Sequence, residues 1–387
     1  MPIMISRFSF PNRMVFGPGA ISQLPELLTE FKATRVLLVS DEGLVRAGLV
    51  DRVREQIEVN AEAVLFTEVE PNPTEPCVDR AAECLHAEGC DLVIGLGGGS
   101  AMDAAKAAAL RANHHASFND YEIQIGGDRN MTEDVPPIFA IPTTAGTGSE
   151  VGRSSVVTLA DGNRKAVICG PKLLPSIALC DPELTLGLPP HITAATGMDA
   201  LTHNIEAYLS TWYHPICDAI ALGGIRLATE NLETAVKDGQ NIEARSNMML
   251  ASSMGAIAFQ KDLGAAHSMA HPLSTIAGVP HGLANAIVLS HVMAFNKPNA
   301  VDRLGDVAQA MGCPVDDRSA EERANAAVEA VQALTERIDI PKTLSAVGVT
   351  ESHIPEMVVQ AMNDPNHATN PRPCSAEDFD TLYRQAL

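Results

Sequence analysis

The chain has 387 residues, of which 46% are hydrophobic, and its formal net charge is −21 at pH 7. This length and composition allow two well-buried domains, and they exclude disordered and fibrous proteins. The negative charge argues against a nucleic-acid partner and against an anionic membrane surface. No stretch reaches the roughly 18 uninterrupted apolar residues of a membrane span, and the first residues lack a targeting pattern, so we expect a cytoplasmic protein.

The first half of the chain, residues 1–184, alternates short β-rich apolar runs with helical stretches. The expected strands are 36–40, 63–66, 92–95 and 138–141. Strands that alternate with helical patterns indicate a parallel sheet with helices on its faces. We therefore predict an N-terminal α/β domain with a mostly parallel sheet over these residues.

A glycine run, Gly97-Gly98-Gly99-Ser100, follows the expected strand at 92–95 and opens an alanine-rich helical stretch. Glycine lets the backbone approach a ligand closely, and the first amides of a helix attract an anion. The run could also be a plain tight turn between strand and helix. We favour a pyrophosphate site, which would make this domain dinucleotide-binding.

Two further features of this half could bind a nucleotide. Asp41 follows the strand at 36–40, where a carboxylate can bind a ribose 2′-hydroxyl and repel a 2′-phosphate, which predicts NAD over NADP. However, Asp41 precedes the glycine run, unlike the acid of the usual fingerprint, and it could equally cap the next helix. The loop 142–150 (PTTAGTGSE) is rich in hydroxyls and could bind the cofactor or only stabilise its own turns.

Beyond Asp181-Pro182 and Pro189-Pro190, strand signals nearly vanish and long stretches with helical periodicity follow. We therefore predict that residues 185–387 form an all-α domain. No flexible linker separates it from the first domain.

This second half carries a cluster of potential metal ligands. Asp199 and His203 are four residues apart, as are His267 and His271, and His281 follows a proline turn. Residues four apart share one face of a helix, so two helices can direct these side chains at one ion. One carboxylate with several imidazoles suits Fe²⁺ or Zn²⁺ and disfavours Ca²⁺ or Mg²⁺. We predict a metal centre rather than unrelated histidines, with iron slightly favoured because it accepts more ligands, although spacing alone does not separate His271 from the ligands.

Four motifs in order resemble the iron-containing (group III) alcohol dehydrogenases along nearly the whole chain. They are the glycine run, the loop 142–150, 197–203 (GMDALTH), and 267–272 (HSMAHP) with Pro280-His281-Gly282. That family includes lactaldehyde reductases, 1,3-propanediol dehydrogenases and 4-hydroxybutyrate dehydrogenases. The resemblance implies an NAD-linked enzyme that interconverts a small primary alcohol and its aldehyde by hydride transfer, with the alcohol oxygen bound to the metal.

The resemblance also implies roles for individual residues. The metal ligands would be Asp199, His203, His267 and His281, and His271 would be an additional active-site histidine close to the metal. We expect either His271 or a chain of water and ribose to supply the proton when the aldehyde is reduced. The metal would be Fe²⁺, with Zn²⁺ as an alternative, and the enzyme would be a homodimer or a higher homo-oligomer. The cofactor NAD would be bound by Asp41, Gly97, Gly98, Gly99, Ser100, Thr143, Thr144, Thr147, Ser149 and Lys165.

The resemblance does not identify the residues of the substrate pocket, because the segments beside it differ from those of lactaldehyde reductases. Candidate substrate contacts are Arg153, Ser154 and Phe259. Arg153 could pair with the carboxylate of a 4-hydroxybutyrate-type hydroxy acid, or it could be a surface residue. Two rival functions are a dehydroquinate synthase-like metal-dependent lyase, which requires a more basic site, and a non-catalytic metal-binding protein, which leaves the glycine run unexplained.

Overall fold

The computed structural model describes residues 5–9, 12–160 and 164–387, and these group into two compact units. One unit, called the α/β unit, comprises 12–144 and Gly148–Gly187. The other, called the helical unit, comprises 5–9, Ala145–Thr147 and Leu188–Leu387. The change of unit after Gly187 lies close to the boundary predicted at residue 184. Within the described ranges, no helix is long and apolar enough to cross a membrane.

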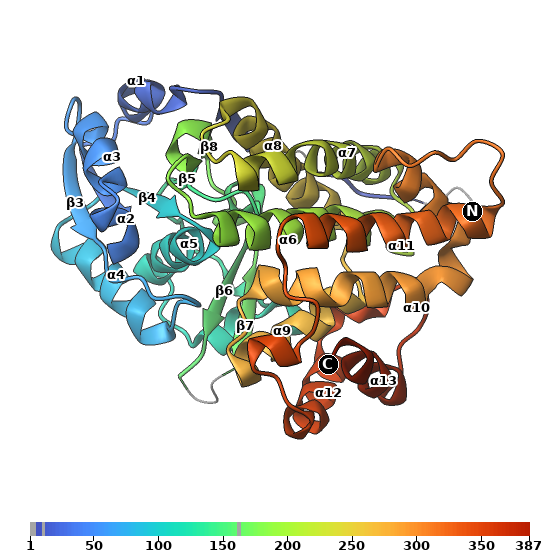
Figure 1. Ribbon diagram of the computed structural model, residues 1–387. Helices are drawn as coiled ribbons and strands as arrows, with labels where there is room; N and C mark the ends of the chain where they lie inside the picture. The colour runs from blue at the N-terminus through green and yellow to red at the C-terminus, as the bar shows by residue number, and fades with distance from the viewer. Residues whose placement is uncertain (1–4, 10–11, 161–163) are drawn as a thin grey trace. The chain divides into compact units, whose positions relative to one another are not determined.

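The α/β unit is built on a six-stranded sheet whose paired strands are all parallel, in the order β1-β8-β5-β4-β2-β3 (Figure 1). Its strands are β1 (Arg13–Phe16), β2 (Arg35–Val39), β3 (Glu62–Phe66), β4 (Leu92–Gly97), β5 (Ile138–Pro142) and β8 (Ile177–Cys180). The four strands expected from the sequence are β2, β3, β4 and β5, so the parallel α/β fold is confirmed. A separate antiparallel pair consists of β6 (Ser154–Thr158) and β7 (Lys165–Cys169).

Helices pack on both faces of the sheet. They are α1 (Leu24–Glu30), α2 (Glu42–Arg46), α3 (Leu49–Ile57), α4 (Glu75–Ala87) and α5 (Gly99–Asn113). Leu37 and Val39 of β2 share a core with α4 and α5, whereas Val36 and Leu38 share the opposite core with α1 and α3. Successive side chains of a strand point to opposite faces, so an almost continuous apolar run is needed to anchor both layers.

The helical unit confirms the predicted all-α second half. Its helices are α6 (Pro190–Leu209), α7 (Pro215–Lys237), α8 (Ile242–Ala258), α9 (Ala265–Ala277), α10 (His281–Ala310), α11 (Ala320–Arg337), α12 (Ile354–Asn363) and α13 (Ala376–Ala386) (Figure 1). Helix α6 packs against α7, α8 and α10, and every residue from Gly197 to Leu209 is buried. A helix buried on all sides has no solvent-facing stripe, so each polar residue on it needs a partner inside the protein.

Candidate metal and cofactor sites

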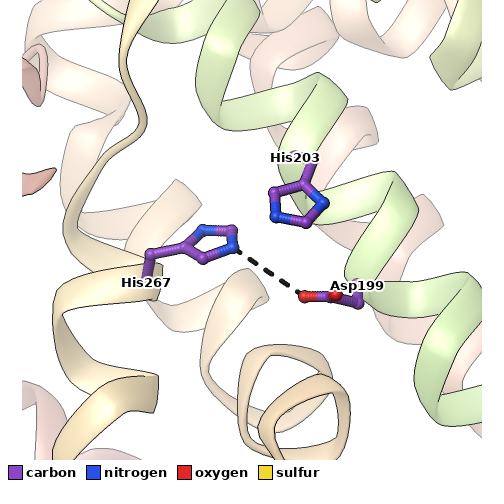
Figure 2. A group of neighbouring side chains, drawn as sticks. All are labelled: Asp199, His203 and His267. Carbon is purple, nitrogen blue, oxygen red and sulfur yellow. Dashed lines mark ion pairs between the residues drawn. The ribbon is translucent and has the colours of Figure 1, made fainter. Parts of the chain in front are cut away.

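Three of the four predicted metal ligands meet inside the helical unit. Asp199 and His203 lie one turn apart on α6, and His267 lies in the first turn of α9 (Figure 2). Each offers one ligand atom, and the three atoms lie within 4.8 Å of one another. All three side chains are buried. Spacing on one helix and contact between two helices thus combine to form the cluster.

The fourth predicted ligand, His281, is the first residue of α10, and its Nε2 lies 3.5 Å from Asp199 Oδ1. Its ring centre is 5.4 Å from that of His267. One turn along α10, the Asn285 amide nitrogen lies 2.8 Å from Asp199 Oδ1 and 3.3 Å from the Nε2 atoms of His267 and His281. The four residues therefore gather at one place, together with Asn285, which was not predicted from the sequence.

The charges of this cluster suit a cation. Burial lowers the pKa of His203 to about 4, so its imidazole is neutral at neutral pH. Burial alone would raise the pKa of Asp199, but the neighbouring histidines bring it below its ordinary value, and the carboxyl is ionised. Metal binding requires a neutral imidazole and an ionised carboxylate. One carboxylate and three imidazoles form a donor set that fits Fe²⁺ or Zn²⁺.

The close approach of α10 to α6 depends on Gly282, beside His281. A Cβ atom at this position would lie 2.3 Å from the carbonyl oxygen of Ala195 and 3.2 Å from Asp199 Cβ. No real contact is that short, so a side chain here would force the two helices apart.

We expect the Gly282→Ala substitution to move the start of α10 away from α6 and to separate His281 from Asp199. The affinity for Zn²⁺, measured by competition with a chelator, should fall about 10-fold or more, as when the support of a ligand is lost. Gly305→Ala on the same helix is the matched control, because its Cβ would meet Arg323 Cβ at an ordinary 3.5 Å. Equal affinities of the two variants would show that the helix contact does not position His281.

His271 has its own hydrogen-bond partner, Asp364, which is not one of the proposed metal ligands. Its Nδ1 donates to Asp364 Oδ2 at 2.6 Å, and Asp364 Oδ1 accepts from Ser268 Oγ and from the Asn366 amide, both at 2.9 Å. Burial would raise the pKa of Asp364, but the hydrogen bond and charge of His271 hold it below its ordinary value. The His271 ring stacks on that of His281 at 5.2 Å. This arrangement leaves Nε2 of His271 as the atom available to exchange a proton.

Several predicted cofactor residues lie at the carboxyl edge of the parallel sheet, where ligands bind in open α/β folds. Gly97 ends β4, Gly98 is the N-cap residue of α5, and Gly99 begins that helix. Asp41 follows β2 and caps α2, because its Oδ1 accepts from the Leu44 amide at 3.1 Å. Thr143 follows β5 and donates its amide to the Gly97 carbonyl at 2.9 Å. A Cβ on Gly97 would lie 3.7 Å from Asp41 Oδ2, so Asp41 and the glycine run are neighbours in space.

The neighbouring candidates complete this edge. A Cβ on Gly98 would lie 3.5 Å from Thr144 Oγ1, which places this threonine beside the glycine run. The Oγ of Ser100, in the first turn of α5, accepts from the Asn72 amide at 3.2 Å. Thr147 belongs to the helical unit. The binding roles of these residues stay predictions.

Ser149 and Lys165 lie at a different point of the α/β unit. The Ser149 hydroxyl donates to Asp103 Oδ1 at 2.7 Å and accepts from Lys106 Nζ at 2.7 Å. Lys165 begins β7 and is half-buried; burial lowers its pKa, and the charge of Asp103 opposes this shift. These two candidates are therefore linked through the Asp103 carboxylate.

The buried Lys106 and the partly buried Asp103 on α5 were not predicted from the sequence. Lys106 Nζ donates to the carbonyl oxygens of Ser149, Gly152 and Ser154, at 2.7, 3.0 and 3.0 Å. Asp103 accepts the Val156 amide at 2.9 Å. The lysine thus ties the loop after Gly148 to α5. A charged residue inside an alanine-rich helix was the available signal, because such a helix is expected to be buried.

The candidate substrate contacts lie in both units. Phe259 directly follows α8 in the helical unit, and its ring centre is 5.2 Å from that of His203. Arg153 is exposed in the α/β unit, where its side chain opposes the rise that burial causes in the pKa of Cys169. Ser154 begins β6. Phe259 thus adjoins the candidate metal site, and the roles of the other two stay predictions.

Comparison with known proteins finds close similarity over the whole chain. A family model described as iron-containing alcohol dehydrogenase matches residues 11–182, and one described as the C-terminal part of the Fe-containing alcohol dehydrogenase family matches residues 193–387. The 4-hydroxybutyrate dehydrogenase of Cupriavidus necator is 40% identical over 95% of this chain and 96% of its own. A crystal structure of 1,3-propanediol oxidoreductase matches with a TM-score of 0.95 at 38% identity, covering 99% of this chain and all of that one. A sulfoacetaldehyde reductase from Bifidobacterium kashiwanohense in complex with NAD⁺ matches with a TM-score of 0.88 at 33% identity over 99% of each chain.

Proposed function

We propose that this chain, which belongs to the iron-containing alcohol dehydrogenase family, interconverts a small primary alcohol and its aldehyde by hydride exchange with NAD. The observation that carries the proposal is the buried convergence of Asp199, His203 and His267 in the helical unit. An ionised carboxylate beside the neutral imidazole of His203 and a second buried imidazole, His267, forms a site for a divalent metal rather than a set of structural histidines.

The metal would be held by Asp199, His203, His267 and His281. The family indicates Fe²⁺, and the same donors would accept Zn²⁺. When bound, such an ion supplies Lewis acidity, which lowers the pKa of an alcohol and polarises a carbonyl. The protein buries the carboxylate and two of the imidazoles. Electrostatic interactions are stronger in the protein interior than in bulk water.

The cofactor would be held at the carboxyl edge of the sheet. The glycine run at the start of α5 would bind pyrophosphate, and Asp41 would bind the ribose 2′-hydroxyl, which favours NAD over NADP. The NAD⁺ complex of the similar sulfoacetaldehyde reductase supports this choice. A homodimer or higher homo-oligomer and a cytoplasmic location belong to the same proposal, and they rest on the family resemblance and the composition.

His271 would move a proton at its Nε2 while Asp364 holds its Nδ1. We expect His271→Ala to lower kcat about 10²- to 10⁴-fold, the range for loss of a general acid or base, and to retain the metal. Turnover and metal content should therefore be measured on the same preparation. If the variant turned over at the wild-type rate, His271 would have no part in proton transfer. If the variant lost the metal, His271 would be a metal ligand.

A neutral alcohol is the main proposal for the substrate, because the apolar ring of Phe259 lies beside His203. A 4-hydroxybutyrate-type hydroxy acid would need a cation for its carboxylate, and Arg153 is the predicted candidate. Relatives of similar identity are a 4-hydroxybutyrate dehydrogenase and a 1,3-propanediol oxidoreductase, so identity alone does not favour the acid.

The test is anaerobic NADH formation by metal-stripped protein reconstituted with Fe²⁺ or Zn²⁺. The substrates are ethanol, butanol, 1,2-propanediol, 1,3-propanediol and 4-hydroxybutyrate. We expect metal-dependent NADH formation with a preference for a neutral alcohol. If the protein preferred 4-hydroxybutyrate, and Arg153→Gln lost this preference, the proposed substrate would be the hydroxy acid and not a neutral alcohol. Absence of metal-dependent NADH formation with every substrate would overturn the dehydrogenase proposal.

A further inference from the structure

A buried carboxylate, Glu206, lies behind the candidate ligand His267 on the side away from Asp199. It sits on α6 one turn beyond His203, and only 3% of its surface is exposed. Its Oε2 is 2.6 Å from His267 Nδ1. The other ring nitrogen, His267 Nε2, faces Asp199 (Figure 2) and lies 3.8 Å from its Oδ1. The imidazole is thus held between two carboxylates of one helix.

The same carboxylate also caps the start of α9. Its Oε1 accepts from the Ala266 amide at 2.6 Å, and its Oε2 accepts from the His267 amide at 3.3 Å. The preceding amide, of Ala265, is bound by Asn370 Oδ1 at 3.2 Å. The first amides of a helix lack partners within the helix and attract negative charge. The N-cap residue of α9 is Gly264, whose Cβ would lie 2.7 Å from Glu206 Oε1, so a glycine is required for this contact.

We propose that Glu206 is a positioning residue that fixes the proton of His267 on Nδ1 and turns the Nε2 lone pair toward Asp199, and thereby sets the affinity of the site for a divalent metal. A carboxylate only accepts hydrogen bonds, so the imidazole nitrogen facing it must carry the proton. The amide nitrogen of Asn285, which also donates to Asp199, lies 3.3 Å from Nε2 and can only donate to that atom, which favours an unprotonated Nε2. Both neighbours of the ring therefore select the same tautomer.

This inference rests on the proposed function, because it assigns His267 as a ligand through Nε2. Orientation of a metal-binding histidine through its second nitrogen commonly changes metal affinity or activity by about 10- to 100-fold. A purely structural cap would also stabilise α9, but it would have no effect on which imidazole nitrogen carries the proton. The tautomer therefore distinguishes the two roles.

The Glu206→Gln substitution preserves the shape of the side chain and replaces one of its two acceptor oxygens by an NH₂ group. If the amide oxygen stays on the Ala266 amide, the NH₂ group faces His267 Nδ1 and forces the proton to Nε2. Burial would lower the pKa of His267, but the hydrogen bond to Glu206 raises it, so the spectra are recorded at a pH high enough to keep the ring neutral. We expect ¹⁵N NMR of histidine-labelled, metal-free protein to show Nδ1–H for His267 in the wild type and Nε2–H in the variant. Zn²⁺ affinity, measured by chelator competition, should fall about 10- to 100-fold.

Asp364→Asn is the matched control, because it removes a carboxylate that lies 2.6 Å from the Nδ1 of a histidine outside the proposed ligand set. We expect it to leave the Zn²⁺ affinity unchanged. A folded Glu206→Gln protein with wild-type tautomer or wild-type affinity would overturn the proposal. So would Nε2–H in the wild type, a result that needs no variant to fold. If the wild type bound neither Zn²⁺ nor Fe²⁺, the proposed function would fail, while the tautomers would still decide whether Glu206 sets the proton position.

Discussion

Asp199→Ala should remove metal-dependent turnover, lowering kcat/KM by about 10³-fold or more, because Lewis-acid stabilisation contributes several kcal/mol. Asp199 is the one anion among the four proposed ligands, and it lies 3.8 Å from His267 Nε2 and 3.5 Å from His281 Nε2. Without it, three neutral imidazoles and the Asn285 amide would face the ion. Metal content and kcat/KM should be measured together on anaerobically prepared protein.

The control for this substitution is His214→Ala in the same unit. His214 is buried, and its ring caps α7 and bonds to the Arg7 carbonyl rather than to the cluster. We expect the loss of the cap to cost about 1 kcal/mol of stability and to leave the metal content unchanged. Full metal content and turnover in Asp199→Ala would show that the cluster is not the catalytic metal site.

Lys106→Met should destabilise the α/β unit strongly, by about 3 kcal/mol or more of unfolding free energy, because each buried acceptor left without its donor costs about 1–3 kcal/mol. The substitution deprives the carbonyls of Ser149, Gly152 and Ser154 of their donor. It also removes the nearby positive charge of Lys106 from the partly buried Asp103 carboxylate. Urea unfolding followed by far-ultraviolet circular dichroism would measure the change.

Two further variants make this prediction specific. Lys237→Met, which removes an exposed lysine paired with Glu233, should change stability by no more than about 0.5 kcal/mol. The double variant Lys106→Met with Asp103→Asn should recover part of the loss, because no uncompensated carboxylate remains. If Lys106→Met unfolded like Lys237→Met, the buried network would not hold the loop.

The parallel sheet was predictable because its central strands are apolar on both faces. Val36 to Val39 form one uninterrupted run, and each residue contributes to one of two cores. Strands β1 and β8 pair at one edge of the sheet and were not expected, because neither run has such a distinct pattern. Long helical periodicity made the second half equally plain, since α6 to α10 contain few interruptions.

The candidate metal cluster was predictable for a different reason. Asp199 and His203 share a helix face, and that face continues to Glu206 three residues later, so the positioning carboxylate could also have been found by its spacing. Asp364 could not, because it is 93 positions from His271 and meets it only through the folding of the segment after α12 onto α9. Asn285 is one turn after His281, but an asparagine carries no specific ligand signal.

At the carboxyl edge of the sheet, sequence motifs predicted only part of the candidate cofactor site. The glycine run and Asp41 follow strands that are neighbours in the sheet, so strand assignment placed them correctly at one edge. Lys165 was named as a candidate through the family resemblance, whereas Lys106 was not singled out. Burial of Lys106 depends on the loop from Ser149 to Ser154 packing over α5, which local sequence does not reveal.

The most direct test of the metal centre is an anomalous difference map at the iron absorption edge, from crystals grown anaerobically with Fe²⁺. We predict one strong peak in contact with Asp199, His203, His267 and His281. A strong peak elsewhere in the protein, with none between these four side chains, would contradict the account.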